Sequence, residues 1–353
     1  GFGCGDGFGR GFGCGDGFGC GFGDGFGDGF GFGDVIGRAD HAVMNAWAVL
    51  AGVVALAAGV ASARADVLAA IVPSGDDVRR SIAVGPSGQV WEPDGTGTWT
   101  RRAEGGVAAD VRGAALAGNA LVVGGKSVPL YRKESAGWIA MRLGERGRTT
   151  VGTGPRASIA IGKTIFVWNG ATWKRVGRTL GNVGALWAAS ETKVVVATDT
   201  GVARYAAGGF TVVTGAPEVA AFGTGGPAPW ATTTDGAAYE VTTRRVHRPT
   251  VAGEPMMVEL VAVSAGTTWA LGRTTTGIGL GRFHKGAWTE AIPPPIADDD
   301  AALAMAADAS GALLVATRGG ALHVLPDGGS WTAGTRAEAL PAATPGPGPA
   351  RGR

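Results

Sequence analysis

The chain has 353 residues, 45% of them hydrophobic and 17% charged, with a net formal charge of +2. This apolar content excludes a chain that is disordered throughout, and the mild charge is not that of a nucleic-acid-binding protein. Gly is very frequent, at 65 residues, and Trp, at 11, outnumbers Tyr, at 3. Many turns and one recurring large aromatic residue are therefore expected.

Residues 1–34 form a low-complexity block in which Gly alternates with Phe, Cys, Asp and one Arg. Alternate Gly offers one side chain per two residues and raises the entropy lost on ordering, so we interpret the block as disordered or as lying upstream of the true start. Its three Cys, at positions 4, 14 and 20, lack a nearby His and a fourth ligand. No metal site is expected there.

Residues 35–65 have the layout of a secretory signal peptide. An unbroken apolar run at 46–61 is followed by Ala63 and Ala65, which form a small-x-small cleavage site before Asp66. The run is shorter than the ~20 residues of a membrane span, so we expect none after cleavage. An uncleaved N-terminal anchor is the alternative. Cleavage predicts a secreted or periplasmic protein.

A repeat of about 40 residues runs through residues 66–336. In most periods a turn related to Asp/Asn-Gly-x-x-Trp ends on a large aromatic residue. The one wide gap between such residues, from Phe210 to Trp288, is divided at Val246. The aromatic residues at this mark are Trp99, Trp138, Trp173, Phe210, Trp288 and Trp331. This period, with β-type patterning, predicts an all-β fold: a seven-bladed β-propeller with four-stranded blades. Residues 337–353 are predicted to be a disordered Pro/Gly-rich tail.

The last period illustrates the expected blade. Residues 301–308 are a small-residue strand suited to a crowded axis, 312–318 a buried second strand and 321–326 a third, and the outer strand starts at Trp331. The recurring aromatic is expected to fill the wedge between successive blades, where twisted sheets diverge.

The segments at 186–190 and 194–205 resemble the blade repeat of two-component-regulator-type sensor propellers, and the Gly-x-x-Trp turns are similar to repeats of secreted bacterial propellers. The resemblance implies the fold over nearly all of 67–336 and no shared catalytic residue. The Asp-box of sialidase-like propellers is not matched, because Thr96 stands where that motif has Gly.

Candidate binding residues follow from the fold. The turns between second and third strands and the connectors between blades should emerge together around the channel mouth, where Ser87 would lie too. This ring predicts ligand-binding roles for Lys126, Lys163, Asp199, Asp235, Arg273 and Arg318, with Asp298, Asp299 and Asp300 nearby. The basic run at 244–248 is interpreted either as an exposed patch for an anionic glycan or lipid or as a charged outer-strand edge that blunts sheet pairing, and we expect binding at the ring.

No catalytic, metal or cofactor motif stands out. His247, His284 and His323 fall in different blades, and Asp298, Asp299 and Asp300 lack the alternate spacing of a calcium loop. We therefore favour a non-catalytic binding or scaffolding module with a protein or glycan partner and no nucleic acid. The alternative is a glycan-active hydrolase or lyase, which would need two carboxylates within ~5–10 Å at the channel mouth.

Overall fold

The computed structural model describes residues 67–104, 110–125, 130–134, 137–264 and 266–337. All of them belong to one of the two units into which the chain divides, Arg64–Arg353. The Gly/Phe block, the expected signal peptide and the tail beyond Ala337 lie outside the described residues. In the described ranges, no helix has the length and apolar character needed to cross a bilayer.

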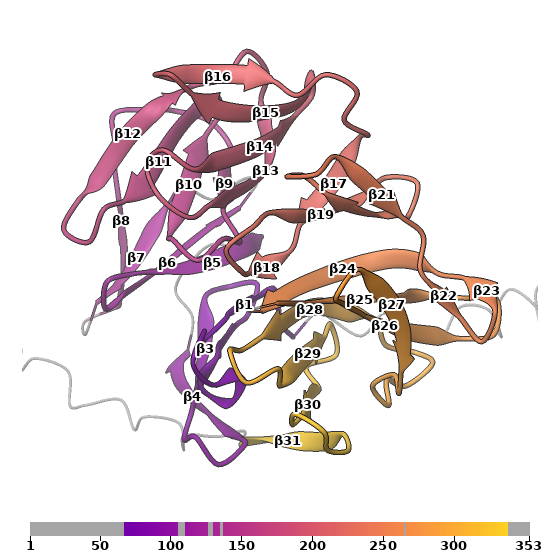
Figure 1. The fold of residues 1–353 in the computed structure, drawn as a ribbon. Helices are drawn as coiled ribbons and strands as arrows, with labels where there is room; N and C mark the ends of the chain where they lie inside the picture. Colours follow the sequence, from indigo (N-terminus) through magenta and orange to yellow (C-terminus); the bar gives the residue numbers. More distant parts are fainter. Residues whose placement is uncertain (1–66, 105–109, 126–129, 135–136, 265, 338–353) are drawn as a thin grey trace, which may run out of the picture. The chain divides into compact units, whose positions relative to one another are not determined.

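The strands form seven antiparallel four-stranded blades, which confirms the predicted propeller (Figure 1). Blades 1 and 7 join in one eight-stranded sheet, and β18 (Thr224–Gly225) adds a fifth strand to blade 6. Blade 1 is β1 (Ala70–Val72), β2 (Ile82–Val84), β3 (Gln89–Pro93) and β4 (Thr98–Glu104). Blade 2 is β5 (Val111–Ala117), β6 (Ala120–Gly125), β7 (Tyr131–Glu134) and β8 (Gly137–Ala140). Blade 3 is β9 (Thr149–Val151), β10 (Ser158–Ile161), β11 (Thr164–Trp168) and β12 (Trp173–Arg178). Blade 4 is β13 (Val183–Ala188), β14 (Val194–Thr198), β15 (Gly201–Ala206) and β16 (Gly209–Val212).

The remaining three blades complete the ring. Blade 5 is β17 (Val219–Phe222), β19 (Trp230–Thr233), β20 (Ala238–Glu240) and β21 (Arg245–His247). Blade 6 is β24 (Met257–Ser264), β25 (Thr267–Arg273), β26 (Ile278–His284) and β27 (Ala287–Ala291). Blade 7 is β28 (Ala302–Ala307), β29 (Leu313–Thr317), β30 (Leu322–Leu325) and β31 (Thr332–Ala337). Outside the blades lie the 3-10 turn η1 (Val78–Arg80), β18 (Thr224–Gly225), β22 (Thr250–Val251) and β23 (Glu254–Pro255).

The wide gap in the repeat has a structural cause. The hairpin β22–β23 is inserted in the connector between blades 5 and 6, and β18 adds a short parallel pairing to β24. At the fourth-strand mark of blade 5, Val246 is 48% exposed. The weakened repeat therefore coincides with an insertion and with an outer strand that buries no large aromatic.

Side chains in the third-to-fourth-strand turns explain the turn motif. Oδ1 of Asp94 accepts hydrogen bonds from the backbone and hydroxyl of Thr96, both 2.7 Å. Oδ1 of Asn169 accepts from the amides of Ala171 and Thr172, both 2.9 Å. Each side chain holds its own turn, as Asx residues commonly do, so the following strand starts in a defined register and its Trp faces one side of the blade.

The outer-strand aromatics lie at interfaces between blades. Trp138 packs on a cluster from blades 1 and 2, Trp173 on one from blades 2 and 3, and Phe210 on one from blades 3 and 4. Trp288 packs on a cluster from blades 5 and 6, and Trp331 on one from blades 6 and 7. Their depth varies: these five are half-buried, whereas Trp99 is fully buried.

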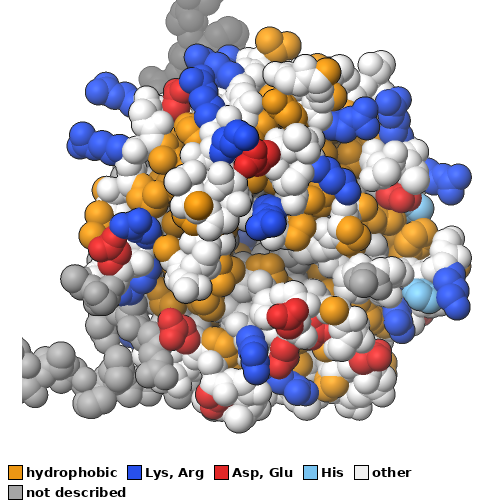
Figure 2. Space-filling model, turned by 60° about the vertical axis from the view of Figure 1, so that its left-hand side comes forward, with side chains coloured by type: hydrophobic (Ala, Val, Ile, Leu, Met, Phe, Trp, Pro, Cys, Tyr) orange, Lys and Arg blue, Asp and Glu red, His pale blue; other side chains and the backbone are white. Residues whose placement is uncertain are grey.

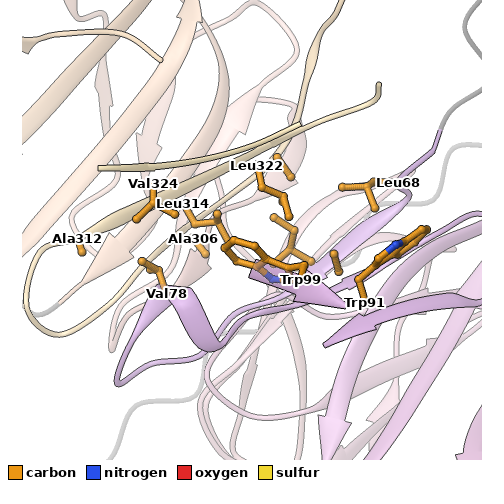
Figure 3. Packing of buried hydrophobic residues seen from close by; sticks show 12 residues of the cluster. Leu68, Val78, Trp91, Trp99, Ala306, Ala312, Leu314, Leu322 and Val324 are labelled. Carbon is orange, nitrogen blue, oxygen red and sulfur yellow. The ribbon is translucent and has the colours of Figure 1, made fainter. Parts of the chain in front are cut away.

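The ring closes between blade 1 and blade 7 without sharing a blade between the two chain ends. The outer strands β4 and β31 pair in parallel, Trp99 opposite Arg336. Below this pairing, Trp99 packs among Leu314 and Leu322 of blade 7, and its indole Nε1 donates to the carbonyl of Ser81 at 2.8 Å (Figure 3). Apolar burial and backbone pairing thus both hold the joint.

Candidate functional site

The expected turns gather at one end of the ring, which we call the connector face. Successive antiparallel strands reverse direction, so the turns between second and third strands and the connectors between blades share one end. The expected residues that the structure describes all lie in those turns, at their edges or in a connector: Lys163, Asp199, Asp235, Arg273, Arg318, Asp298, Asp299 and Asp300. Lys126 lies outside the described residues. Their role in binding stays a prediction.

Lys163 and Asp199 lie on either side of the connector between blades 3 and 4. Lys163 Nζ donates to the carbonyl of Leu180 at 2.6 Å. Asp199 accepts from the backbone and side-chain nitrogens of Asn182, at 3.1 and 3.0 Å. Gly181 permits this approach, because a Cβ there would lie 2.0 Å from Asp199 Oδ1. The connector is therefore held from both sides.

Asp235 and Arg273 are each paired with an opposite charge. Asp235 accepts from the Thr233 hydroxyl and from the Arg248 guanidinium, and these hydrogen bonds hold the pKa of its carboxyl below the usual value. Arg273 Nε donates to Glu259 at 3.0 Å. The basic run at 244–248 is therefore not confined to an outer edge, since Arg248 reaches a turn of the connector face.

Asp300 stabilises the protein's own backbone. Its Oδ1 accepts from the amides of Ala301 and Gly319, both at 2.8 Å. Arg318 takes part through its main chain, accepting from the amide of Val67 at 2.8 Å. These bonds link the last connector, the second-to-third-strand turn of blade 7 and the start of blade 1. Asp298 and Asp299 are exposed in that connector. Among the described residues, no group of three or more His, Cys, Asp or Glu could hold a metal.

The three His do not form a common site. His247 packs in an aromatic cluster with Trp230, Phe283 and Trp288 between blades 5 and 6, with ring centroids 5.0 to 6.2 Å from its own. His323 is buried in β30 of blade 7. The sequence did not predict the aromatic cluster, because its four members come from four different strands.

A channel of about 510 Å³ runs between the innermost strands. Its walls are mostly small or aliphatic, including Ala114, Val151, Val261 and Leu303. Glycine allows the strands to approach, since a Cβ on Gly113 would lie 2.9 Å from Val151. The channel is suited to apolar groups and contains few titratable side chains.

A second hollow, of about 760 Å³, opens on the connector face between blades 3 and 4, and we call it the basic hollow. Four cationic side chains line it: Arg146, Arg148, Lys163 and Arg178. A smaller cavity lined by Arg148 and Arg112 lies between it and the channel. Figure 2 shows one face of the molecule with Lys and Arg side chains spread around a central depression.

Of the charged residues that line the basic hollow, the sequence predicted only Lys163 and Asp199. Arg146 and Arg148 belong to the connector between blades 2 and 3, and Arg178 ends the outer strand of blade 3. The amide of Gly162 donates to the carbonyl of Arg148 at 2.9 Å, which brings the connector onto the turn of Lys163. In the sequence, the only indication of this hollow was the presence of several basic residues in the connector between blades 2 and 3.

Comparison with known proteins supports the fold alone. No protein-family model matches the chain, and no curated protein matches it either. Many solved structures do match. YCF48 from Cyanidioschyzon merolae is 17% identical with a TM-score of 0.54, covering 76% of this chain and 97% of that one.

Two further matching structures are an enzyme and a WD40 domain. A streptogramin B lyase structure is 11% identical, TM-score 0.52, covering 75% of this chain and 95% of its own. The WD40 β-propeller domain of Doa1 is 14% identical, TM-score 0.51, covering 73% and 92%. A lyase and a WD40 domain share this architecture, so the fold does not decide between catalysis and binding.

The carboxylates expected for a hydrolase are not gathered in either cavity. Asp199 lines the basic hollow, whereas Asp235 and Asp300 line neither the hollow nor the channel. Asp235 is bound by Arg248 and Asp300 by backbone amides. The geometry of the described connector face is therefore that of a charged rim around an apolar channel.

Proposed function

We propose that this protein is an exported, non-catalytic binding module that recognises a protein partner with its connector face. The observation that carries the proposal is the distribution of exposed apolar side chains. In the described residues, the three most exposed large hydrophobic side chains are Leu180 at 78%, Ile292 at 73% and Met257 at 62%. All three lie in connectors between blades or at the first residue after one.

Apolar side chains among charged turns are typical of a recognition surface. Protein interfaces bury an apolar centre inside a polar rim, and exposed apolar groups that gather on one face of a molecule indicate such a centre. The neighbouring turns supply charges of both signs, through Lys163, Asp199 and Arg273. A partner with an asymmetric surface fits this arrangement better than a repeated ligand does.

The proposal is tested by selecting ligands for the full-length chain from a random peptide library and a glycan array. Selected ligands are then measured against two matched triple variants. The face variant carries Leu180→Ser, Met257→Ser and Ile292→Ser, and the control carries Ile139→Ser, Val212→Ser and Val246→Ser on outer strands, which are 46–48% exposed. We expect the face variant to lose at least about tenfold in affinity and the control to bind normally. Equal loss in both, or a screen that returns no ligand, would contradict the proposal.

Export is supported by the apolar run at 46–61 followed by Ala63 and Ala65. We expect N-terminal sequencing to show that protein secreted by a bacterial host begins at Asp66. Signal peptidase recognises the two small residues, Ala63 and Ala65, and cleaves once, after Ala65. Recovery of an uncleaved chain from the membrane fraction would instead support an anchor. The sensor-propeller resemblance is consistent with a receptor or scaffold outside the cytoplasm.

A further inference from the structure

We infer that the basic hollow binds an acidic, extended peptide segment of the partner, with Leu180 as the apolar contact beside it. The inference rests on the proposed function, because it assigns a chemical class of ligand to part of the connector face. Four cationic side chains line this hollow, and its one carboxylate is already hydrogen-bonded to Asn182. A highly exposed leucine, Leu180, lies beside it.

The positive charge of the hollow is not neutralised by the protein itself. In the part of the chain that the structure describes, no carboxylate pairs with Arg146, Arg148 or Arg178. The one carboxylate in the lining, Asp199, already accepts two hydrogen bonds from Asn182. Three exposed guanidinium groups therefore face the solvent with their donors available, and planar guanidinium forks match carboxylates well.

The backbone holds these cations close to one another. The carbonyl of Arg148 accepts from Gly162, the residue before Lys163. The amide of Thr179, directly after Arg178, donates to the carbonyl of Lys163 at 2.9 Å. Gly162 has φ +60°, and a Cβ on Gly147 would lie only 3.2 Å from it, so both positions favour glycine. The cations are thus attached to a turn, a connector and a strand end, and the turn hydrogen-bonds to the other two segments.

The apolar neighbour argues for a peptide over other polyanions. Leu180 lies two residues from Arg178 and from Asn182, both of which line the hollow, and its carbonyl is bound by Lys163. An exposed leucine gains from contact with an apolar side chain, which a peptide supplies and a sulfated glycan or a phosphate backbone does not. The lining also contains no aromatic residue on which a base could stack.

The size of the hollow favours a segment over a single ion. At about 760 Å³ it falls in the range of ligand-sized pockets, and it is open to solvent along the connectors. Exposed ion pairs are individually weak in water, so several carboxylates spaced along an extended chain are needed for useful affinity. Alternating acidic and apolar residues would place carboxylates on one side of the strand and an apolar group on the other.

The experiment uses a labelled short peptide in which Glu alternates with Leu, titrated into the full-length protein. The hollow variant carries Arg146→Ser, Arg148→Ser and Arg178→Ser. Its matched control carries Arg244→Ser, Arg245→Ser and Lys285→Ser. These substitutions remove the same charge from exposed residues in or next to the third-to-fourth-strand turns, at the opposite ends of the strands. We expect the hollow variant to lose roughly tenfold in affinity and the control less than about twofold. Urea midpoints of both should match the parent.

Further measurements separate the contributions of charge and of the apolar contact to binding. The Glu-to-Gln form of the peptide should bind weakly, added salt should weaken the acidic peptide, and Leu180→Ser alone should weaken it too. A sulfated glycosaminoglycan or a single-stranded oligonucleotide that binds tightly through the three Arg, without dependence on Leu180, would overturn the inference. So would equal binding of the neutral peptide.

The outcomes also distinguish this inference from the proposed function. Ligands selected in the screen that depend on Leu180, Met257 and Ile292 but not on the three Arg would leave the binding face standing and refute the acidic peptide. Ligands that depend on the outer-strand residues would refute the binding face itself.

Discussion

Trp99 differs from the other recurring aromatics in depth and in contacts. It is fully buried, and its indole nitrogen is hydrogen-bonded to Ser81. Gly334 lies against its ring, where a Cβ would be 2.5 Å from Cζ3. Trp173 is half-buried and makes an edge contact with Trp168 at 5.6 Å. The recurring aromatic therefore has the same position in each blade but not the same burial, because its burial depends on the residues of the neighbouring blade.

We therefore expect Trp99→Ala to lower the free energy of unfolding by about 3–5 kcal/mol, through a cavity in the joint between blades 1 and 7. Trp173→Ala should cost about 1–3 kcal/mol, because less of its side chain is removed from water. Urea denaturation of both variants measures the difference. A larger loss for Trp173 would show that blades 2 and 3 form the more critical joint.

His323 makes stability depend on pH. It is 7% exposed and its Nδ1 has no partner in the described structure. Burial lowers the pKa of its imidazole below the ordinary value of 6.5, and this outweighs the opposing effect of Asp300. Because the folded pKa is lowered, the unfolded chain binds the proton more readily. The stabilising contribution is complete above pH 6.5 and is lost as pH falls toward the folded pKa.

We expect His323→Leu to remove that part of the pH dependence. Urea midpoints measured between pH 7.5 and about 5 should fall for the parent and fall less for the variant. The comparison of slopes is independent of any overall change in stability caused by the new side chain. Parallel slopes would show that His323 remains solvated when charged.

At the level of elements, the turn between β28 and β29 connects blade 7 to blade 1. The buried carboxylate of Asp308 accepts from the amides of Ser310 and Ala312, at 2.9 and 3.1 Å, and from the Ser310 hydroxyl at 2.6 Å. Its other oxygen accepts from the amide of Val78, the first residue of η1, at 3.0 Å. One side chain therefore organises its own turn and holds the neighbouring blade.

Asp308→Ala should lower the free energy of unfolding by about 2–4 kcal/mol, because buried amides lose a charged acceptor. Asp300→Ala is the comparison, since its carboxylate accepts two backbone hydrogen bonds but is only half-buried. We expect a loss of about 1–2 kcal/mol there. Similar urea midpoints for the two variants would mean that the contact with Val78 adds nothing.

The strands were predictable from local pattern because each hairpin is formed by residues close in sequence. The expected strands of the last blade, at 301–308, 312–318 and 321–326, contain β28, β29 and β30. The basic hollow was not predictable in the same way. Its cations come from a connector, a turn and a strand end, and the antiparallel pairing of β9 with β10 brings Arg148 beside the turn that carries Lys163.

At the level of the whole molecule, the ring is closed by a short parallel pairing of outer strands, Thr335 to Ala337 with Thr98 to Thr100. A chain ending at Gly334 lacks this pairing, whereas one ending at Ala337 keeps it. We expect the shorter chain to be less stable by about 2 kcal/mol, the contribution of roughly two backbone hydrogen bonds. Differential scanning calorimetry of the two chains measures the loss. Equal transition temperatures would mean that the apolar core around Trp99 closes the ring unaided.

The joint between the first and last blades also has a consequence in time. Val78 and the carboxylate that it contacts are separated by 230 residues, so during synthesis the first blade waits for its neighbour. At translation rates of 5–20 residues per second, this wait is roughly ten to fifty seconds. Throughout it, the side of blade 1 that carries Trp99 and Leu68, which blade 7 will cover, has nothing to pack against. Ribosome-bound chains should therefore bind a chaperone holdase until the seventh blade emerges, and the last step of folding should be slow because it joins the most distant parts of the chain.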